Sequence, residues 1–101
     1  MATLTKALFR GAATTNTGTT LYTVPASTTT VVTDILVANT SASAQTFTLA
    51  LDGVSIGSTV AIGAYDSTSI SLKQVLATTK VIAGGASATS VTIHISGVEI
   101  S

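Results

Sequence analysis

The side chains that could carry acid–base or metal chemistry are few in this 101-residue chain. The only imidazole is His94, and the carboxylates are Asp34, Asp52, Asp66 and Glu99. General acid–base catalysis needs titratable groups held close together in unlike environments. A catalytic zinc needs several ligands, which one histidine without any cysteine does not supply. The sequence therefore indicates neither kind of site.

One short string matches a nucleophile motif. Residues 53–57 read Gly-Val-Ser-Ile-Gly, the G-x-S-x-G pattern in which a serine stands on a turn from strand to helix. Here Ser55 follows an Asp-Gly pair that is typical of a β-hairpin, and no helical pattern comes after it. A triad with His94 would require geometry that nothing in the sequence indicates. We expect the match to be coincidental and the chain not to be an enzyme.

The carboxylates have structural explanations. We assign Asp52 to the Asp-Gly turn, Asp66 to a loop in which it accepts local backbone N–H groups, and Glu99 to a solvent-facing position in a terminal strand. Asp34 stands between apolar residues in a predicted strand, so it is either exposed or paired with a cation across an interface. For His94 we expect a surface or interface position.

Charge is scarce. Only 8% of the residues are charged and the formal net charge is zero, against roughly a quarter charged residues in an ordinary soluble domain. The four cations are spread along the chain, whereas phosphate binding needs a clustered basic face. A surface with so little charge does not keep copies of the chain apart, so we expect association and no nucleic-acid partner.

Two further signals concern processing and membranes. Residues 39–41 read Asn-Thr-Ser, a glycosylation sequon, but residues 1–11 lack the apolar stretch of a secretory signal, so we expect a strand-end turn there. The apolar run of residues 35–38 is too short to cross a bilayer. These observations predict synthesis in a cytoplasm.

Apolar and polar residues alternate with a period of two in several segments, which predicts an all-β fold. Phe47, Leu49 and Leu51 form one inward stripe, and Val91, Ile93 and Ile95 form another. Residues 29–39 carry apolar side chains on both faces of the predicted strand, so this strand is either central in its sheet or has its second face covered by a partner. A helical turn is expected at 73–77, and glycine turns at 84–85 and 97. Strands are expected at 19–24, 29–39, 45–51, 54–56, 68–72, 80–83, 90–96 and 98–100. These seven to eight short strands predict an antiparallel β-sandwich, either Ig-like or jelly-roll.

An internal likeness leaves two interpretations open. Residues 42–56 align without gaps on residues 86–100, and both read as a polar turn, an alternating stripe, a glycine and an apolar pair. Either one strand-turn unit occurs in both halves of the sandwich, or a small alphabet has produced the match.

Residues 1–18 are expected to form an arm ahead of a β-sandwich domain of residues 19–101. The arm carries the apolar residues Leu4, Ala7, Leu8 and Phe9 together with two cations. Such an arm either adds an edge strand or docks on a neighbouring molecule, and we favour docking. The candidate partner contacts are Leu4, Lys6, Leu8, Phe9, Arg10, Asp34 and His94.

Four stretches carry a family resemblance: residues 8–12 (LFRGA), 18–25 (GTTLYTVP), 34–40 (DILVANT) and 95–100 (ISGVEI). Together they resemble small β-sandwich structural proteins of tailed bacteriophage virions, over most of the chain. The likeness lies in short stretches of similar sequence and not in a catalytic motif. Such proteins have glycine after the Pro-Ala pair, where this chain has Ser27, so the type of turn there stays open.

The resemblance implies a virion component on the head or the tail. We expect a capsid decoration (cement) protein that forms a symmetric homo-oligomer, with a trimer preferred, and docks through its arm on the major capsid protein. A tail, baseplate or fibre component is the alternative, and a carbohydrate-binding adhesion module that uses Tyr22 and Tyr65 is a further one. We expect no cofactor, metal or membrane partner, and a location in the virion after synthesis in the host bacterial cytoplasm.

Overall fold

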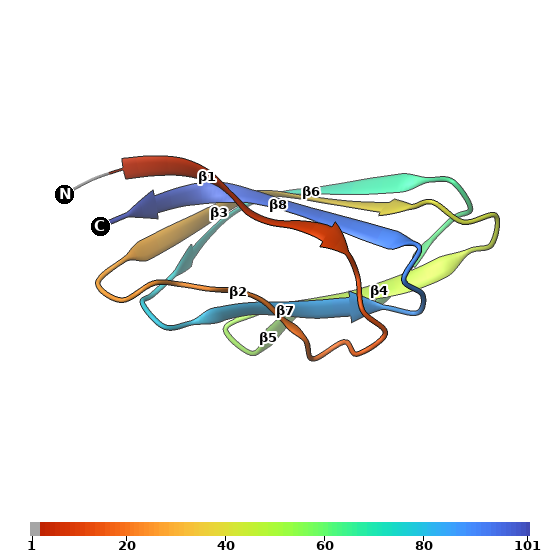
Figure 1. The fold of residues 1–101 in the computed structure, drawn as a ribbon, viewed down its shortest axis with the longest axis horizontal. Helices are drawn as coiled ribbons and strands as arrows, with labels where there is room; N and C mark the ends of the chain where they lie inside the picture. Colours follow the sequence, from red (N-terminus) through yellow and green to blue (C-terminus); the bar gives the residue numbers. More distant parts are fainter. Residues whose placement is uncertain (1–2) are drawn as a thin grey trace.

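The predicted antiparallel β-sandwich is confirmed. In the computed structural model, which describes residues 3–101, eight strands form two antiparallel four-stranded sheets, and the described residues include no helix (Figure 1). The strands are β1 (Thr3–Ala12), β2 (Thr20–Thr23), β3 (Thr29–Asn39), β4 (Gln45–Leu51), β5 (Val54–Ile62), β6 (Ser67–Leu76), β7 (Val81–Ala86) and β8 (Val91–Ile100).

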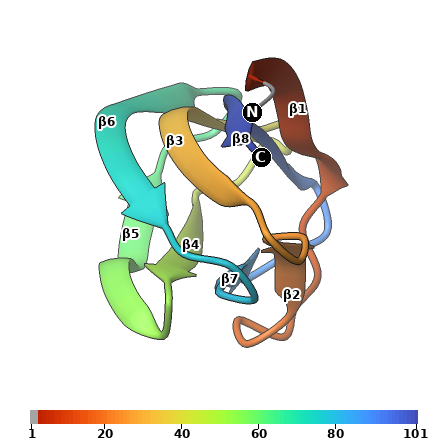
Figure 2. The ribbon, with the colours of Figure 1, turned by 90° about the vertical axis from the view of Figure 1, so that its left-hand side faces the viewer.

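The strand order is that of a jelly roll. One sheet has the order β1-β8-β3-β6 and the other β2-β7-β4-β5, so only the β4–β5 hairpin stays within a sheet. Every other connection crosses from one sheet to the other, and the two sheets lie one above the other when viewed along the strands (Figure 2). An Ig-like sandwich pairs its first strand with its second, which this chain does not do. Of the two predicted variants, the jelly roll is therefore the one present.

The core lies between the two sheets and is almost entirely aliphatic. The alternating stripes predicted in β4 and β8 point inward, and Phe47 is the only aromatic ring among the buried residues of the described chain. The predicted central position of residues 29–39 is confirmed, because β3 pairs with both β6 and β8. The buried aliphatic set includes Val32, Ile35, Val37, Leu49, Leu51, Ile62, Ile82, Val91, Ile93 and Ile95.

Two of the turns with left-handed backbones are ones that were singled out from the sequence. Asp52 and Gly53, with φ of 52° and 75°, form the predicted tight hairpin between β4 and β5. Ser27 has a φ of 58°, in the region that glycine enters without steric cost. The loop before β3 therefore has the backbone that a glycine would favour, although a serine occupies it.

The N-terminal segment is a strand of the sandwich and not a separate arm. β1 forms the edge of the first sheet and pairs with β8 along nearly its whole length, and Leu8 is buried in the core. Residues 13–19 are also tied down, since the backbone N–H of Ala13 donates to Val91 and that of Gly84 to Thr19. The chain gains these hydrogen bonds and the burial of Leu8 by pairing with itself. Met1 and Ala2, which the predicted arm included, lie outside the described residues.

Glycines that were predicted to be turns lie inside strands. β7 continues through Gly84 and Gly85, and a Cβ added to Gly85 would lie 2.5 Å from the Asn16 carbonyl oxygen. β8 continues through Gly97, where an added Cβ would lie 2.4 Å from the Val31 carbonyl oxygen and 2.8 Å from Leu8 Cδ1. These glycines allow another segment to approach the strand, which is the second common use of glycine in a sheet.

Two other predictions fail for related reasons. Residues 73–76 continue β6 and do not form a helical turn. The internal likeness is not a structural repeat, because residues 42–56 include a strand, a hairpin turn and the start of β5, whereas β8 runs unbroken from Val91 to Ile100. A limited alphabet of Ser, Thr, Val, Ile and Gly therefore accounts for the match.

We expect Gly97→Ala to lower the free energy of unfolding by at least about 2 kcal/mol, because the new methyl group would clash with the Val31 backbone and with Leu8. Gly11→Ala in the same sheet is the control. An added Cβ there meets Phe9 at 3.6 Å, an ordinary contact, so its stability should be unchanged or up to about 1 kcal/mol higher. Urea unfolding followed by circular dichroism measures both, and equal stabilities would contradict the close approach.

Asn39 closes the end of the sandwich that lies opposite the termini. Its Nδ2 donates to the carbonyl oxygens of Ser43 (2.7 Å) and Gly63 (3.1 Å), with the Ile62 carbonyl at 3.4 Å. Its Oδ1 accepts the backbone N–H of Ser41 (3.0 Å) and the Ser41 hydroxyl (2.8 Å). The side chain of the sequon asparagine is thus buried and fully engaged in holding loops, as the predicted turn requires.

Asn39→Asp should destabilise the protein by at least about 3 kcal/mol, because a carboxylate would face carbonyl oxygens that now receive N–H groups. Asn16→Asp is the matched control. Asn16 Oδ1 accepts the Gly18 N–H at 2.9 Å, a bond that aspartate preserves, so the change should stay within about 0.5 kcal/mol. The thermal unfolding midpoint of Asn39→Asp should be clearly lower than that of Asn16→Asp. Similar midpoints would argue against the hydrogen-bond network of Asn39.

Candidate interaction surface

The outer face of the first sheet carries small, hydroxylic and aliphatic side chains. Alternate residues of β8 are buried, which defines the core face, and the strand register extends the opposite face across the other three strands. We call this surface the outer face. One row across the sheet holds Thr5, Val98, Val31 and Val75, the next Ala7, Ser96, Asp34 and Ser71, and the next Arg10, His94, Leu36 and Ser69.

Three of the predicted contact residues meet on the outer face. Arg10 lies opposite His94, and His94 lies opposite Leu36, whose side chain is 40% exposed. Asp34 is exposed, as one of its two predicted alternatives required, and Ser71 Oγ donates to Asp34 Oδ1 at 3.4 Å. The surface or interface position predicted for His94 therefore holds for the surface, and no structural finding tests an interface.

The other four predicted contacts belong to β1 and do not lie together on one surface. Leu8 is buried and Phe9 packs half-buried against the core, so neither is available to a partner. Leu4 is 56% exposed at the sheet edge. Lys6 bends toward the terminal end of the sandwich, where its Nζ lies 3.4 Å from Glu99 Oε1. A docking arm would have kept all four side chains together on one surface, which the edge strand does not do.

Glu99 is buried and does not face solvent, which corrects the prediction from the sequence. Its side chain lies on the core face of β8 with only 9% of the residue exposed. The Tyr22 hydroxyl donates to its carboxylate, the Thr30 hydroxyl lies 2.8 Å from the Tyr22 oxygen, and Lys6 supplies a positive charge. A carboxylate is tolerated inside a protein when it is paired in this way. These four residues, from β1, β2, β3 and β8, are the Glu99 cluster.

Burial and the bond to Glu99 together raise the pKa of Tyr22 to about 12, with burial the larger cause. The phenolate would lose hydration in this position and would also face the Glu99 carboxylate, which favours the protonated phenol. The hydroxyl of Thr30 acts in the opposite direction on the same pKa. Tyr22 thus acts as a hydrogen-bond donor to a buried carboxylate throughout the neutral range.

Because the pKa of Tyr22 rises from its ordinary value of 10.0 to about 12 on folding, the unfolded chain releases this proton first as the pH rises. The contribution of Tyr22 to stability should be complete below pH 10.0 and be lost progressively as the pH rises to about 12. Phenolate absorbance in a Tyr65→Phe background reports Tyr22 alone. A folded-state midpoint close to 10.0 would contradict the cluster, and Tyr22→Phe should remove this part of the alkaline loss of stability.

The residues of the nucleophile motif do not form a catalytic arrangement. Ser55 lies on β5 in the second sheet, directly after the Asp52-Gly53 hairpin turn, whereas His94 lies on the outer face of the first sheet. Residues 3–101 contain no group of three metal-ligating side chains and no helix long and apolar enough to span a membrane. Ser55 and His94 therefore belong to different sheets and do not meet.

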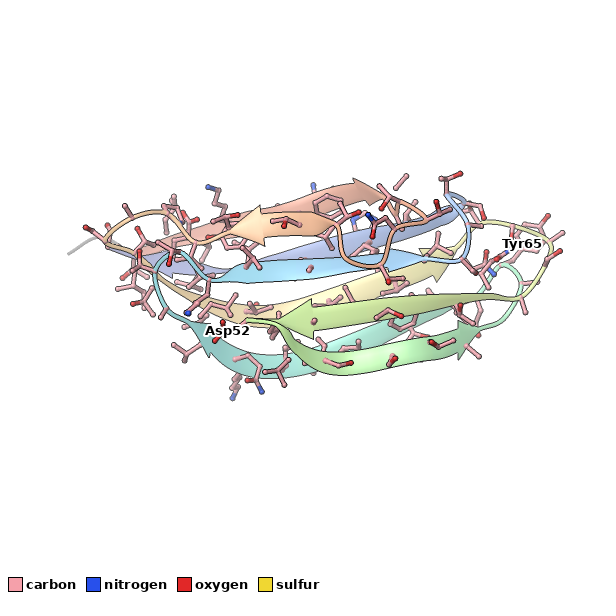
Figure 3. All side chains as sticks on the ribbon, turned by 90° about the horizontal axis from the view of Figure 1, so that it is seen from below. Asp52 and Tyr65 are labelled. Atoms are coloured by element: carbon pink, nitrogen blue, oxygen red, sulfur yellow. The ribbon has the colours of Figure 1, made fainter. Side chains whose placement is uncertain are left out.

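The two tyrosines do not share a surface. Tyr65 is 74% exposed in the loop between β5 and β6, at the end of the sandwich away from the termini, with Asp52 nearer the other end (Figure 3). The Tyr22 hydroxyl is instead held in the Glu99 cluster, next to the C-terminal part of β8. A sugar-binding platform built from both rings is therefore not formed by the described residues.

Two shallow depressions mark the middle of the outer face, one on each side of Thr33. The larger is lined by Thr33, Asp34, Ser71, Leu72 and Lys73. The other is lined by Thr5, Lys6, Ala7, Arg10, Thr33, Ser96, Gly97 and Val98. Both follow from irregular pairing, since the register shifts at Leu8 in β1, at Thr33 in β3 and at residues 72–73 in β6. The sequence carries no signal for these bulges, so Thr33 and Lys73 were not among the predicted contacts.

The chain matches no protein-family model, and no curated protein matches it either. The resemblance to bacteriophage structural proteins, based on four short stretches, therefore stays a prediction. What the structure adds to it is a jelly-roll fold and a single continuous surface on which Arg10, Asp34 and His94 lie.

Proposed function

We propose that this chain is a non-enzymatic structural protein of a bacteriophage virion, a capsid decoration protein that forms a symmetric homo-oligomer. It acts by covering a surface of the capsid, and its outer face is the part that contacts other proteins. Docking is therefore assigned to the first sheet and not to a separate arm of residues 1–18. Strand β1 contributes Arg10 to the outer face. A trimer remains the preferred oligomer, because repeated virion positions commonly follow rotational symmetry.

The observation that carries this proposal is the near absence of charge on an exposed sheet face. Across the three middle rows of the outer face, the charged side chains are Arg10 and Asp34. Leu36 and Val75 are exposed there at 40% and 67%. Flat surfaces with few charges and exposed aliphatic side chains are typical of protein interfaces.

The rigidity of the fold suits a static attachment. All sheet pairings but the β4–β5 hairpin join segments that are distant in sequence, and every buried side-chain nitrogen or oxygen in the described residues has a hydrogen-bond partner. Such a domain presents its face with little loss of conformational freedom on binding. Its single unit of 46 × 21 × 18 Å contains no fibre-like extension among the described residues, which favours the head over a fibre.

The proposal is tested with purified protein and capsid shells that lack their decoration protein. We expect a stable oligomer in light scattering and saturable co-sedimentation with the shells. Leu36→Lys should weaken co-sedimentation at least about tenfold, because it places a charge in the middle of the outer face. Ile56→Lys is the matched control, since Ile56 is 38% exposed, close to the 40% of Leu36, but belongs to β5 in the other sheet.

Three results would contradict the proposal or its contact surface. A monomer at high concentration that ignores the shells would exclude a decoration role. Binding to isolated tails or baseplates, with none to the shells, would place the protein on the tail instead. Equal loss of binding in both lysine variants would show that the outer face is not the contact surface.

A further inference from the structure

The cations of this chain gather along the two depressions of the outer face. Of its four lysine and arginine residues, Lys6, Arg10 and Lys73 line the depressions. The Nζ of Lys6 is paired with the buried Glu99, which leaves Arg10 and Lys73 as the cations whose charge belongs to the depressions. Lys80 pairs with Asp52 at 3.7 Å on another part of the molecule. Of the four carboxylates, only Asp34 lines the depressions. A chain with zero net charge thus has a surplus of positive charge at one place.

Shape and charge coincide at this place. The two depressions share Thr33 and lie side by side across the strands of the first sheet, and we call the pair the groove. Small residues, among them Ala7, Ser96 and Gly97, line one depression together with Arg10, and Lys73 lines the other. Because the bulges of β1, β3 and β6 create the groove, a partner segment would lie across the strands and not along a sheet edge.

We infer that this groove binds an acidic loop of the partner protein, with Arg10 at one end and Lys73 at the other meeting carboxylates of that loop. The inference rests on the proposed function and names the chemistry of its contact. Charge complementarity selects the occupant, since a loop with surplus carboxylates would neutralise the cations that the chain places here.

The same groove is poorly suited to a nucleic acid. Asp34 lies near its middle, where it would repel a phosphate backbone, which carries a charge at every nucleotide. An acidic protein loop avoids this repulsion where it places a hydroxyl or amide group, not a carboxylate, against Asp34 and donates a hydrogen bond to it. Leu72 and Val98 line the groove as well, and these aliphatic side chains contact a protein segment without losing a hydrogen bond. A protein segment can therefore make favourable contacts with the cations, with Asp34 and with the aliphatic side chains of the groove.

Charge reversals test the inference. Arg10→Glu and Lys73→Glu should each weaken co-sedimentation with undecorated shells at least about tenfold, with a larger loss at low salt, because each variant places like charges opposite each other. Lys80→Glu makes the same change outside the groove and should bind within about twofold of the unaltered protein. All three positions are exposed, so circular dichroism should show that each variant is folded.

A second measurement separates this inference from the proposed function. An octaglutamate peptide, titrated at low salt and followed by amide NMR shifts, should perturb residues around Thr33 in the unaltered protein and in Lys80→Glu, but not in Lys73→Glu. If the shells bind all three variants equally and the peptide shifts spread evenly over the surface, the groove is not an acidic-loop site although the proposed function stands. If no shells bind while the peptide still shifts the groove, the decoration role fails and the groove remains an acidic-loop site. A DNA oligonucleotide that shifts the same residues more strongly than the peptide would overturn the inference.

Discussion

Strand β8 has a bulged strand on each side at residues 95–97, and this constraint determines what the first sheet presents to its surroundings. Leu8 of β1 and Thr33 of β3 are the extra residues in the two neighbouring ladders. Gly97 allows both strands to come close, since its missing side chain leaves room for the Val31 carbonyl and for Leu8. Leu8 can therefore enter the core while Arg10 faces outward, and the groove at Thr33 follows from the same irregularity.

The scarcity of charge makes the positions of the few charges informative. In an ordinary domain, exposed charges are so numerous that their positions say little about function. Here seven of the eight charged residues separate into recognisable groups, and the eighth, Asp66, accepts the Ser67 N–H in its loop. Lys80 and Asp52 form an exposed pair, Glu99 is buried beside Lys6, and Arg10, Asp34 and Lys73 lie along the groove. A small net attraction on an otherwise neutral face orients a partner more than it strengthens binding.

The strands whose side chains alternate were predicted correctly from the sequence. The predictions were wrong where contacts between segments that are distant in sequence determine the structure. Residues 29–39 and 45–51 were predicted with the bounds that the structure has, because their stripes of Val, Ile, Leu and Phe match the period of a strand. Gly97 was predicted to be a turn, since only the approach of β1 and β3 shows why a strand needs glycine there. Glu99 was placed in solvent because its partners Tyr22 and Lys6 are distant in sequence. Arg10, Asp34 and His94 of the proposed contact surface were among the residues predicted from the sequence, but the groove lined by Arg10 and Lys73 arises from bulges that no periodicity reveals.

The Glu99 cluster explains why β1 belongs to the fold although it lies at the edge. Glu99 is buried although the Lys6 side chain is 46% exposed, and removing the charged partner of a buried carboxylate leaves its charge uncompensated, which is costly. Lys6 therefore holds β1 against β8 by making its departure unfavourable, in addition to the pairing of the strands. Tyr22 donates a second, uncharged hydrogen bond to the Glu99 carboxylate beside Lys6. It also brings β2 of the second sheet into the same contact. The strand that carries Arg10 to the outer face is thus fixed at its exposed end by the one buried carboxylate of the described chain.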